Sequence, residues 1–537
     1  MSDGPQFDYL VVGAGSAGAP LAARLSEDPA SRVLLLEAGR DYRTFSETPP
    51  DVLDSRNLAS MEHDWGFTAV PVPGRTIPYR RGKLVGGCSA MNSCAALWGR
   101  RLDFDEWMAL GNPEWGWDRV EPFFRDLETD QDYPDPPHGS SGPVPITRFK
   151  DEELITIQRA FRDGCRTVGM ADLADFNNSE NEGVGPWPMN RIETTRVSAA
   201  TAFLDEARSR PNLTIRQNTL VNRVVLDGKR AVAVELSDGE LLEAEKIVLS
   251  AGAFGSPAIL LRSGIGPARE VGALGITSRI DLPGVGARLW DHASVPIRLV
   301  PKPGQCVPGR DPRFQLAARF TLPGSTDRND AMLVLVTHLD LRPFPALMDL
   351  IGVPVVALLN AALMRPRGHG RLRLRSADPN IQPEIDLGFS SEPEDLQSLM
   401  LATRVGFGVA RSAPISREIE RIAELDEEAV QSDELLKQYV LQNLSSFHHA
   451  LGTAPMGREG DPNAVVDEHG KVHGLENLWI ADASIIPSIP RVIPNMICMV
   501  IGQRIGDWLS TELPRGGVTP SNSVSLRSQS WADAVTA

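Results

Sequence analysis

The sequence has 537 residues, too many for a single hydrophobic core, and so predicts two or more domains. Its formal net charge of −16 argues against nucleic acid or an anionic membrane surface as a partner, and solubility alone accounts for the acidity. The hydrophobic content of 42% and the charged content of 23% are ordinary for a soluble globular protein.

The cysteines and apolar runs predict a protein of the cytoplasm with no membrane span. The first strand is expected near Phe7, which leaves no room for a signal peptide. The uncharged run 350–364 contains a proline and is shorter than the ~20 residues that a span needs, so we expect a buried wall there. Five cysteines, odd in number and without metal-site spacing, favour reduced thiols and predict no metal centre: Cys88, Cys94, Cys165, Cys306 and Cys498.

Residues 8–25 predict the start of a dinucleotide-binding unit. An apolar strand (8–12) leads into an alanine-rich helix (19–25) through three spaced glycines. Gly13 can make the tight turn, Gly15 lets a diphosphate approach the backbone, and Gly18 lets the helix pack closely on the strand. The helix N-terminus then directs free amides and a positive dipole at the phosphates.

A second strand, 32–36, ends in Glu37, where a carboxylate could accept hydrogen bonds from a ribose diol. The strand, the helix and the acid together predict dinucleotide binding, which the three glycines alone would not. The cofactor contacts expected from this unit are Gly13, Gly15, Ser16, Ala17, Gly18, Glu37 and Ala38.

Two later segments narrow the class of dinucleotide-binding protein to which the sequence can belong. Residues 81–92 read RGKLVGGCSAMN, and paired glycines beside small side chains make a backbone surface able to lie against a flat ligand. Residues 252–267 read GAFGSPAILLRSGIGP, after a buried strand, 246–250. Together with the glycine turn, these segments resemble the two signatures of the glucose–methanol–choline (GMC) flavoprotein oxidoreductases. Residues 282–292 continue the likeness, and in the family pattern His292 belongs to a structural turn beside the cofactor.

The resemblance implies a mixed α/β (α+β) fold with a Rossmann-like FAD-binding domain and a discontinuous substrate domain of sheet plus helices. We expect the FAD-binding domain to span 1–148, 198–297 and 446–512, and the substrate domain 149–197 and 298–445. The polar residues 513–537 are expected to be a mobile tail.

The cofactor that the resemblance implies is FAD. Met91 occupies the place where some family members carry a histidine bonded covalently to the cofactor, so we expect noncovalent FAD. The further contacts implied are Arg81, Val85, Gly86, Gly87, Ser89, Asn92, Ala95, Val221, Ala251, Gly252, Asp482, Ala483, Pro494 and Asn495.

Residues 446–457, SFHHALGTAPMG, carry the expected catalytic group. Histidine is the side chain whose pKa suits proton transfer near neutral pH. The family's catalytic base corresponds to His449, and the preceding His448 is interpreted as a residue that supports the base or contacts the cofactor.

The helix expected to begin at Pro494 and Asn495 would direct its positive end at the reduced flavin, as the family uses it. Family members usually carry Asn or His as partner to the base two places before Asn495, but here that place is Ile493. Three readings stay open: His449 works alone, Asn495 or His448 serves as partner, or the alignment at this point is shifted.

The sequence therefore predicts an FAD-dependent oxidation of an alcohol to an aldehyde or ketone, with hydride transfer to the flavin. The alternatives are an FAD-containing lyase of the same fold, such as a hydroxynitrile lyase, and a flavin-binding protein without turnover. The expected partners are a small alcohol and dioxygen or another electron acceptor. The alcohol, the acceptor and the oligomeric state stay open.

Overall fold

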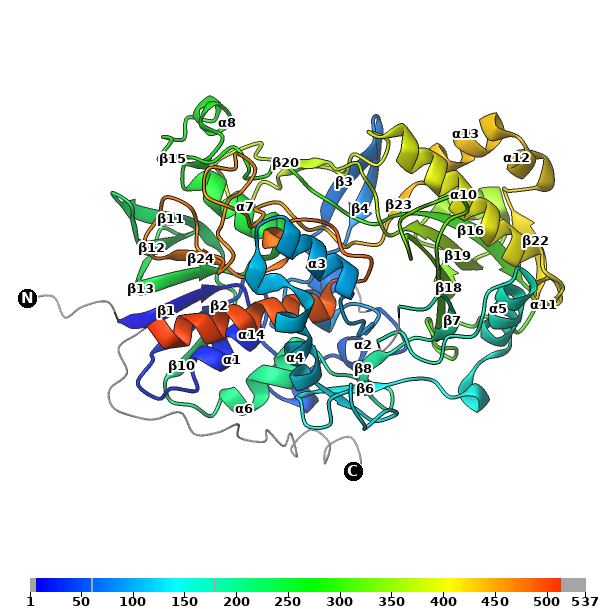
Figure 1. Cartoon of the computed structure of the whole chain (residues 1–537), viewed down its shortest axis with the longest axis horizontal. Coiled ribbons are helices and arrows are strands. Elements are labelled where there is room, and N and C mark those ends of the chain that lie inside the picture. The colour runs from blue at the N-terminus through cyan, green and yellow to red at the C-terminus, as the bar shows by residue number, and fades with distance from the viewer. Residues whose placement is uncertain (1–5, 59–60, 178–179, 513–537) are drawn as a thin grey trace, which may run out of the picture.

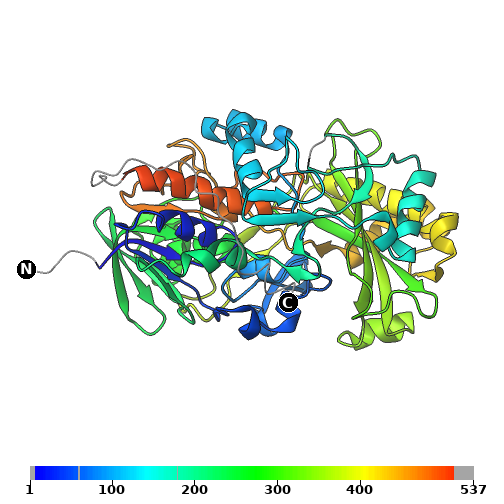
Figure 2. The same cartoon turned by 90° about the horizontal axis from the view of Figure 1, so that it is seen from below.

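The computed structural model describes residues 6–58, 61–177 and 180–512. The tail predicted at 513–537 lies outside them. Two large sheets form opposite ends of an elongated molecule, with α3 (Arg101–Ala109) and α4 (Trp117–Leu127) between them (Figures 1 and 2). The mixed α/β fold class expected from the sequence is confirmed.

The first sheet is built on the N-terminal strand. β1 (Phe7–Val12) pairs in parallel with β2 (Val33–Leu36) on one side and with β13 (Leu241–Leu249) on the other. All four residues of β2 are buried, as its unbroken VLLL sequence requires in a parallel sheet covered on both faces. The sheet is completed by β10 (Leu213–Arg216), β24 (Leu478–Ile480), β11 (Val221–Asp227) and β12 (Arg230–Leu236).

Two helices that are far apart in sequence lie together beside this sheet. α1 (Gly18–Leu25) follows β1, and α14 (Asn495–Glu512) packs against it (Figure 1). The contact is close because a Cβ atom at Gly502 would lie 2.1 Å from the carbonyl oxygen of Ala17. The C-terminal helix is thereby fixed beside the glycine turn that precedes α1.

The second sheet is antiparallel, and its central strands are β16 (Ala293–Pro301), β19 (Val355–Leu363) and β18 (Ala331–Asp340). The run 350–364, expected to be a buried wall, mostly forms β19. None of the helices in the described ranges is long and apolar enough to cross a membrane. The outer strands are β17 (Leu316–Phe320), β7 (Gly183–Pro186), β22 (Ile419–Ala423) and β23 (Ser445–Ser446), and the helices around the sheet include α5 (Thr156–Thr167), α10 (Pro393–Arg411) and α13 (Asp433–Asn443).

Two smaller sheets lie between the large ones. One contains the hairpin of β3 (Phe67–Val72) and β4 (Arg75–Tyr79), with β21 (Glu384–Asp386) and the edge strand β20 (Arg371–Arg373). The other contains β5 (Glu128–Asp130), β6 (Val144–Thr147), β8 (Met189–Ile192) and β9 (Thr195–Arg196). The remaining short elements are α2 (Pro50–Leu53), α6 (Asp205–Ala207), α7 (Gly252–Arg262), α8 (Ala268–Ala273), α9 (Pro345–Ile351), α11 (Ala413–Ser416), α12 (Glu427–Gln431), β14 (Ile265–Gly266) and β15 (Ile280–Asp281).

The predicted domain limits stay a prediction. The limit between residues 297 and 298 falls inside β16, a nine-residue strand. β23 pairs with β16, so the segment that carries the histidine pair begins on the second sheet. The strand β16 thus runs across the predicted domain limit, next to the segment that carries the histidine pair.

Candidate active site

A cavity of about 1220 Å³ runs from the carboxyl ends of β1 and β2 to the second sheet. Its volume exceeds that of most small-ligand pockets, which favours a dinucleotide together with a substrate. Of the cofactor contacts expected from the sequence, those that line it are Gly13, Gly15, Ser16, Ala17, Glu37, Ala38, Arg81, Gly87, Asn92, Ala95, Val221, Ala251, Gly252, Asp482, Ala483, Pro494 and Asn495.

Four of the expected contacts lie behind the cavity wall instead. A Cβ at Gly18 would meet the Gly13 carbonyl oxygen at 1.9 Å, so Gly18 serves the close packing of helix on turn. The Ser89 hydroxyl donates to the Gly86 carbonyl at 2.6 Å and accepts the amide of Ala199 at 2.8 Å. Val85 is buried. Gly18, Val85, Gly86 and Ser89 therefore shape the wall without facing the cavity.

The glycine turn leaves an open approach to the backbone. Gly13 has a φ of +102°, and a Cβ there would lie 2.4 Å from the carbonyl oxygen of Ser250. At Gly15, by contrast, the nearest atom to a Cβ would be Gly87 Cα at 3.9 Å. Gly15 and Gly87 thus approach each other with bare backbone. Because both line the cavity, a diphosphate in the cavity could reach the backbone of the turn.

The carboxylate of Glu37 is held at the end of β2 by two backbone amides. It accepts Gly39 N–H at 2.8 Å and Ala14 N–H at 3.0 Å. Burial raises the pKa of Glu37 to about 7 in spite of these donors. A ribose diol at this place could donate to the remaining lone pairs of the carboxylate.

The N-terminus of α14 brings an unpaired donor to the cavity. Ser16 donates its hydroxyl to Asn495 Oδ1 at 3.1 Å, which fixes the orientation of the amide. Asn495 Nδ2 is then buried without a hydrogen-bond partner among the described residues. Because buried donors are normally paired, this atom fits a ligand that presents an acceptor, such as a flavin carbonyl.

Beside this donor, two histidines from distant segments meet. His449 Nδ1 lies 3.0 Å from His292 Nδ1, and His292 Nε2 lies 2.9 Å from the carbonyl oxygen of Pro490. A carbonyl only accepts, so His292 carries its proton on Nε2 and offers Nδ1 as an acceptor. His449 must then carry its proton on Nδ1, which leaves its Nε2 with a free lone pair.

Asp291 holds both histidine backbones in place. Its Oδ1 accepts the amides of His292 and His449, each at 2.8 Å. Its Oδ2 accepts the hydroxyls of Tyr79, at 2.8 Å, and of Ser446. One buried carboxylate therefore joins β4, the start of β16 and the histidine turn.

All three histidines of the site are neutral at neutral pH. Burial lowers the pKa of His292 to about 4. Burial, together with the charges of Arg81 and Arg80, lowers the pKa of His448 to about 3. Burial, His292, Arg81 and His448 hold the pKa of His449 well below its usual range. A neutral imidazole with a bare nitrogen is the form that a general base requires.

His448 and Ile493 complete this part of the wall. His448 adopts a φ of +63°, a conformation that L-residues seldom take outside functional turns, and its ring lies edge-on to Tyr79 at 4.8 Å. Its Nδ1 is buried without a partner among the described residues. Ile493 lines the cavity and offers no polar atom. The polar neighbour of His449 is instead His292, which was expected only in a structural turn beside the cofactor.

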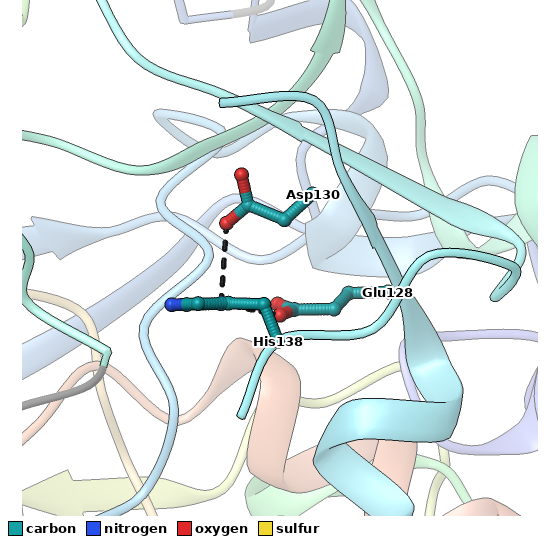
Figure 3. A group of neighbouring side chains, drawn as sticks. All are labelled: Glu128, Asp130 and His138. Atoms are coloured by element: carbon teal, nitrogen blue, oxygen red, sulfur yellow. Dashed lines mark hydrogen bonds and ion pairs between the residues drawn. The ribbon is translucent and has the colours of Figure 1, made fainter. Parts of the chain in front are cut away.

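A second cluster of titratable groups lies outside the cavity. Figure 3 shows the carboxylates of Glu128 and Asp130 turned toward the ring of His138, the one trio in the described chain with metal-ligand spacing. His138 Nδ1 lies 2.7 Å from Glu128, its Nε2 lies 2.9 Å from Asp175, and the Arg148 guanidinium bonds Asp130 and Asp175 at 2.8 Å. Two cations, His138 and Arg148, thus already pair with these three acids, and we assign the cluster to structure.

We expect this cluster to stabilise the fold at neutral pH and to lose that effect at alkaline pH. Burial alone would lower the pKa of His138, but hydrogen bonds to Asp175 and Glu128 raise it to about 9. Its contribution to the free energy of unfolding is full below the unfolded value of ~6.5 and disappears as the pH rises through 9. The difference in melting temperature between wild type and His138→Gln should therefore shrink from pH 6 to pH 10. A constant difference would contradict this assignment.

A dinucleotide cradle with a neutral histidine pair beside it fits an FAD-dependent oxidoreductase, and comparison with known proteins agrees. Two models described as GMC oxidoreductase match residues 7–294 and 366–502. The chain therefore belongs to the GMC oxidoreductase family, as its signatures predicted.

Relatives match along almost the whole chain. The 5-(hydroxymethyl)furfural oxidase of Methylovorus sp. (strain MP688) is 33% identical, with 94% of this chain and 99% of the relative covered. An oxygen-dependent choline dehydrogenase of Escherichia coli O17:K52:H18 (strain UMN026 / ExPEC) is 33% identical, over 95% and 97%. The crystal structure of pyridoxine 4-oxidase from Mesorbium loti superposes with a TM-score of 0.86 at 28% identity, over 95% and 100%.

Proposed function

We propose that this enzyme oxidises an alcohol to an aldehyde or ketone, with His449 as the general base. The observation that carries the proposal is the hydrogen-bond chain from Pro490 through His292 to His449, which leaves His449 Nε2 unprotonated. That nitrogen has no partner among the described residues, and its side chain lines the cavity.

The residues that would hold FAD are distributed along the cavity. Gly15 and the start of α1 would bind the diphosphate, and Glu37 would bind the ribose. Asn495 Nδ2 and the N-terminus of α14 would lie against the flavin, where a positive dipole stabilises negative charge. When bound, FAD supplies the acceptor for the hydride.

In the reaction, the alcohol O–H proton moves to His449 Nε2 while the carbinol hydrogen leaves carbon with its electron pair as hydride. The carbonyl double bond forms as these two bonds break. His292 holds the His449 ring in the tautomer that can accept this proton, and Asp291 fixes the backbone from which the ring projects. Noncovalent FAD and a hydride acceptor site at flavin N5 are part of the proposal.

The test is an anaerobic titration with a broad panel of primary and secondary alcohols. At least one alcohol should bleach the flavin absorbance, and admission of air then shows whether dioxygen restores it. A lyase or a flavin-binding protein without turnover would keep its absorbance across the whole panel, which would overturn the proposal.

We expect the cofactor to leave the protein on acid precipitation, with the yellow colour in the supernatant. Met91 lines the cavity and offers no group that bonds readily to a flavin carbon. Of the two thiols that line it, Cys498 is unreactive because burial raises its pKa to about 12. Colour that stays in the pellet would contradict noncovalent binding, and a Cys88→Ser variant would then test the other thiol.

A further inference from the structure

On the side formed by the second sheet, the cavity wall carries several arginines. Four of them line it, from the β4 hairpin, from β16 and from the segment before β17: Arg75, Arg80, Arg298 and Arg313. Two of these arginines already make side-chain hydrogen bonds. Arg298 Nη1 bonds Glu424 at 3.0 Å and Asn443 at 2.7 Å, and Arg75 donates to the carbonyl oxygen of Leu444.

Arg313 makes no such side-chain hydrogen bond, although Arg75 also has a buried Nε without a partner among the described residues. The Nε of Arg313 is buried without a hydrogen-bond partner, and within the described ranges no carboxylate pairs with its guanidinium. Burial, together with the charge of Arg80, lowers the pKa of Arg313 to about 10. Like charges that line one cavity repel each other, and an anion bound beside them would relieve that repulsion.

The pair lies on the histidine side of the cavity, because the charge of Arg80 also lowers the pKa of His448. An anion bound there would lie on the side of His448, the residue that precedes the proposed base. A substrate could therefore place a charged group at Arg313 and its hydroxyl at His449.

Other unpaired polar atoms in this wall are donors too. Trp187 Nε1 is buried without a partner among the described residues, and the Trp187 ring stacks on Phe314 at 6.5 Å and 24°. The acids that line the cavity are already engaged: Glu37 by backbone amides, Asp340 by Arg342 and Asp482 by Ser256 and Ser484. Each described carboxylate that lines the cavity is thus engaged, and this part of the wall presents unpaired donors beside an aromatic surface.

We propose that the alcohol this enzyme oxidises carries a carboxylate, which Arg313 binds beside Arg80, while Phe314 and Trp187 pack on the apolar part of the substrate. A carboxylate suits the site because its two coplanar oxygens match the fork of a guanidinium. This inference rests on the proposed alcohol oxidation, since it names the substrate class for that site.

The experiment compares kcat/KM for matched pairs, 4-(hydroxymethyl)benzoate with 4-methylbenzyl alcohol and 4-hydroxybutyrate with 1-butanol. Wild type should prefer each acid by about 10-fold or more. Arg313→Gln should lower kcat/KM for the acids by about 10- to 100-fold, mainly through KM, and leave the neutral alcohols unchanged. Arg313→Lys should restore part of the preference. Arg298→Gln is the matched control, because the charge of Arg298 is already paired with Glu424. This variant should keep the preference for the acids over the neutral alcohols.

Binding without turnover separates this inference from the proposed function. Benzoate, which cannot be oxidised as an alcohol, should perturb the flavin spectrum of the wild-type holoenzyme and bind Arg313→Gln at least 10-fold more weakly. If no alcohol bleaches the flavin but benzoate binding depends on Arg313, the proposed function fails and the anion site stands. If neutral alcohols bleach the flavin and the acids are not preferred, or if Arg313→Gln slows acid and neutral substrates equally, the anion site is refuted and the oxidation stands.

Discussion

Replacing His449 by Ala should slow reduction of the flavin by roughly 10²- to 10⁴-fold, the usual contribution of a positioned general base. The reason is that His449 Nε2 is the bare nitrogen of the buried pair, and its ring is held by His292 at 3.0 Å. Stopped-flow measurement under anaerobic conditions, with an alcohol that bleaches the wild type, isolates this step from reoxidation.

Asn495→Ala is the matched comparison for His449→Ala. Asn495 directs an unpaired N–H toward the cavity and so can stabilise charge on the flavin, but its amide does not take up a proton near neutral pH. We therefore expect a smaller loss than in His449→Ala. An equal collapse in both variants would contradict the assignment of His449 alone as the base.

The pH dependence gives an independent check on His449. Burial, His292 and Arg81 hold the pKa of His449 well below its usual range, so the base stays unprotonated through neutral pH. The kcat/KM of the wild type should stay flat from pH 8 down to ~6.5, where an unperturbed histidine would already be half protonated. An acid limb centred at 6.5 or above would show that the ring is not held neutral as the geometry implies.

The sequence predicted the cofactor end of the site because that chemistry is local. A buried strand, a glycine turn and a helix follow one another between Phe7 and Leu25, so local sequence predicts a backbone turn that can lie against a diphosphate. Glu37 and Asn495 were found in the same way, at the end of a strand and the start of a helix.

The remaining parts of the site depend on contacts between distant segments. His292 and His449 are 157 positions apart, and the pairing of β23 with β16 and the amide bonds to Asp291 bring them together. One signal was available: Asp291 and His292 are two adjacent polar residues within an apolar stretch, where polar groups need buried partners. Arg313 gave no such signal, because a missing carboxylate partner can be seen only in three dimensions. The hairpin of β3 and β4 was likewise missed in a stretch rich in turn residues.

Replacing His292 by Phe should slow flavin reduction by about 10- to 10³-fold, although His292 touches neither substrate nor the hydride acceptor in the proposed reaction. Phenylalanine keeps the ring but removes the acceptor at Nδ1, so nothing selects the His449 tautomer with a bare Nε2. Loss of tautomer control over a catalytic histidine can cost as much as 10⁴ in other enzymes. The rate constant for anaerobic reduction measures the effect.

A merely structural role for His292 would not move the pH profile or respond to a conservative replacement. His292→Asn offers an amide oxygen toward His449 Nδ1–H, although its amide is too short to reach Pro490, so it should recover part of the rate lost in His292→Phe. Because the charge of His292 helps to lower the pKa of His449, the acid limb should move to higher pH in both variants. His369→Phe, a histidine packed edge-on against Trp290 and absent from the cavity lining, should leave both unchanged. If His292→Phe lowers the rate equally at every pH and His292→Asn rescues nothing, His292 only supports the fold, and the selection of the His449 tautomer must come from elsewhere in the site.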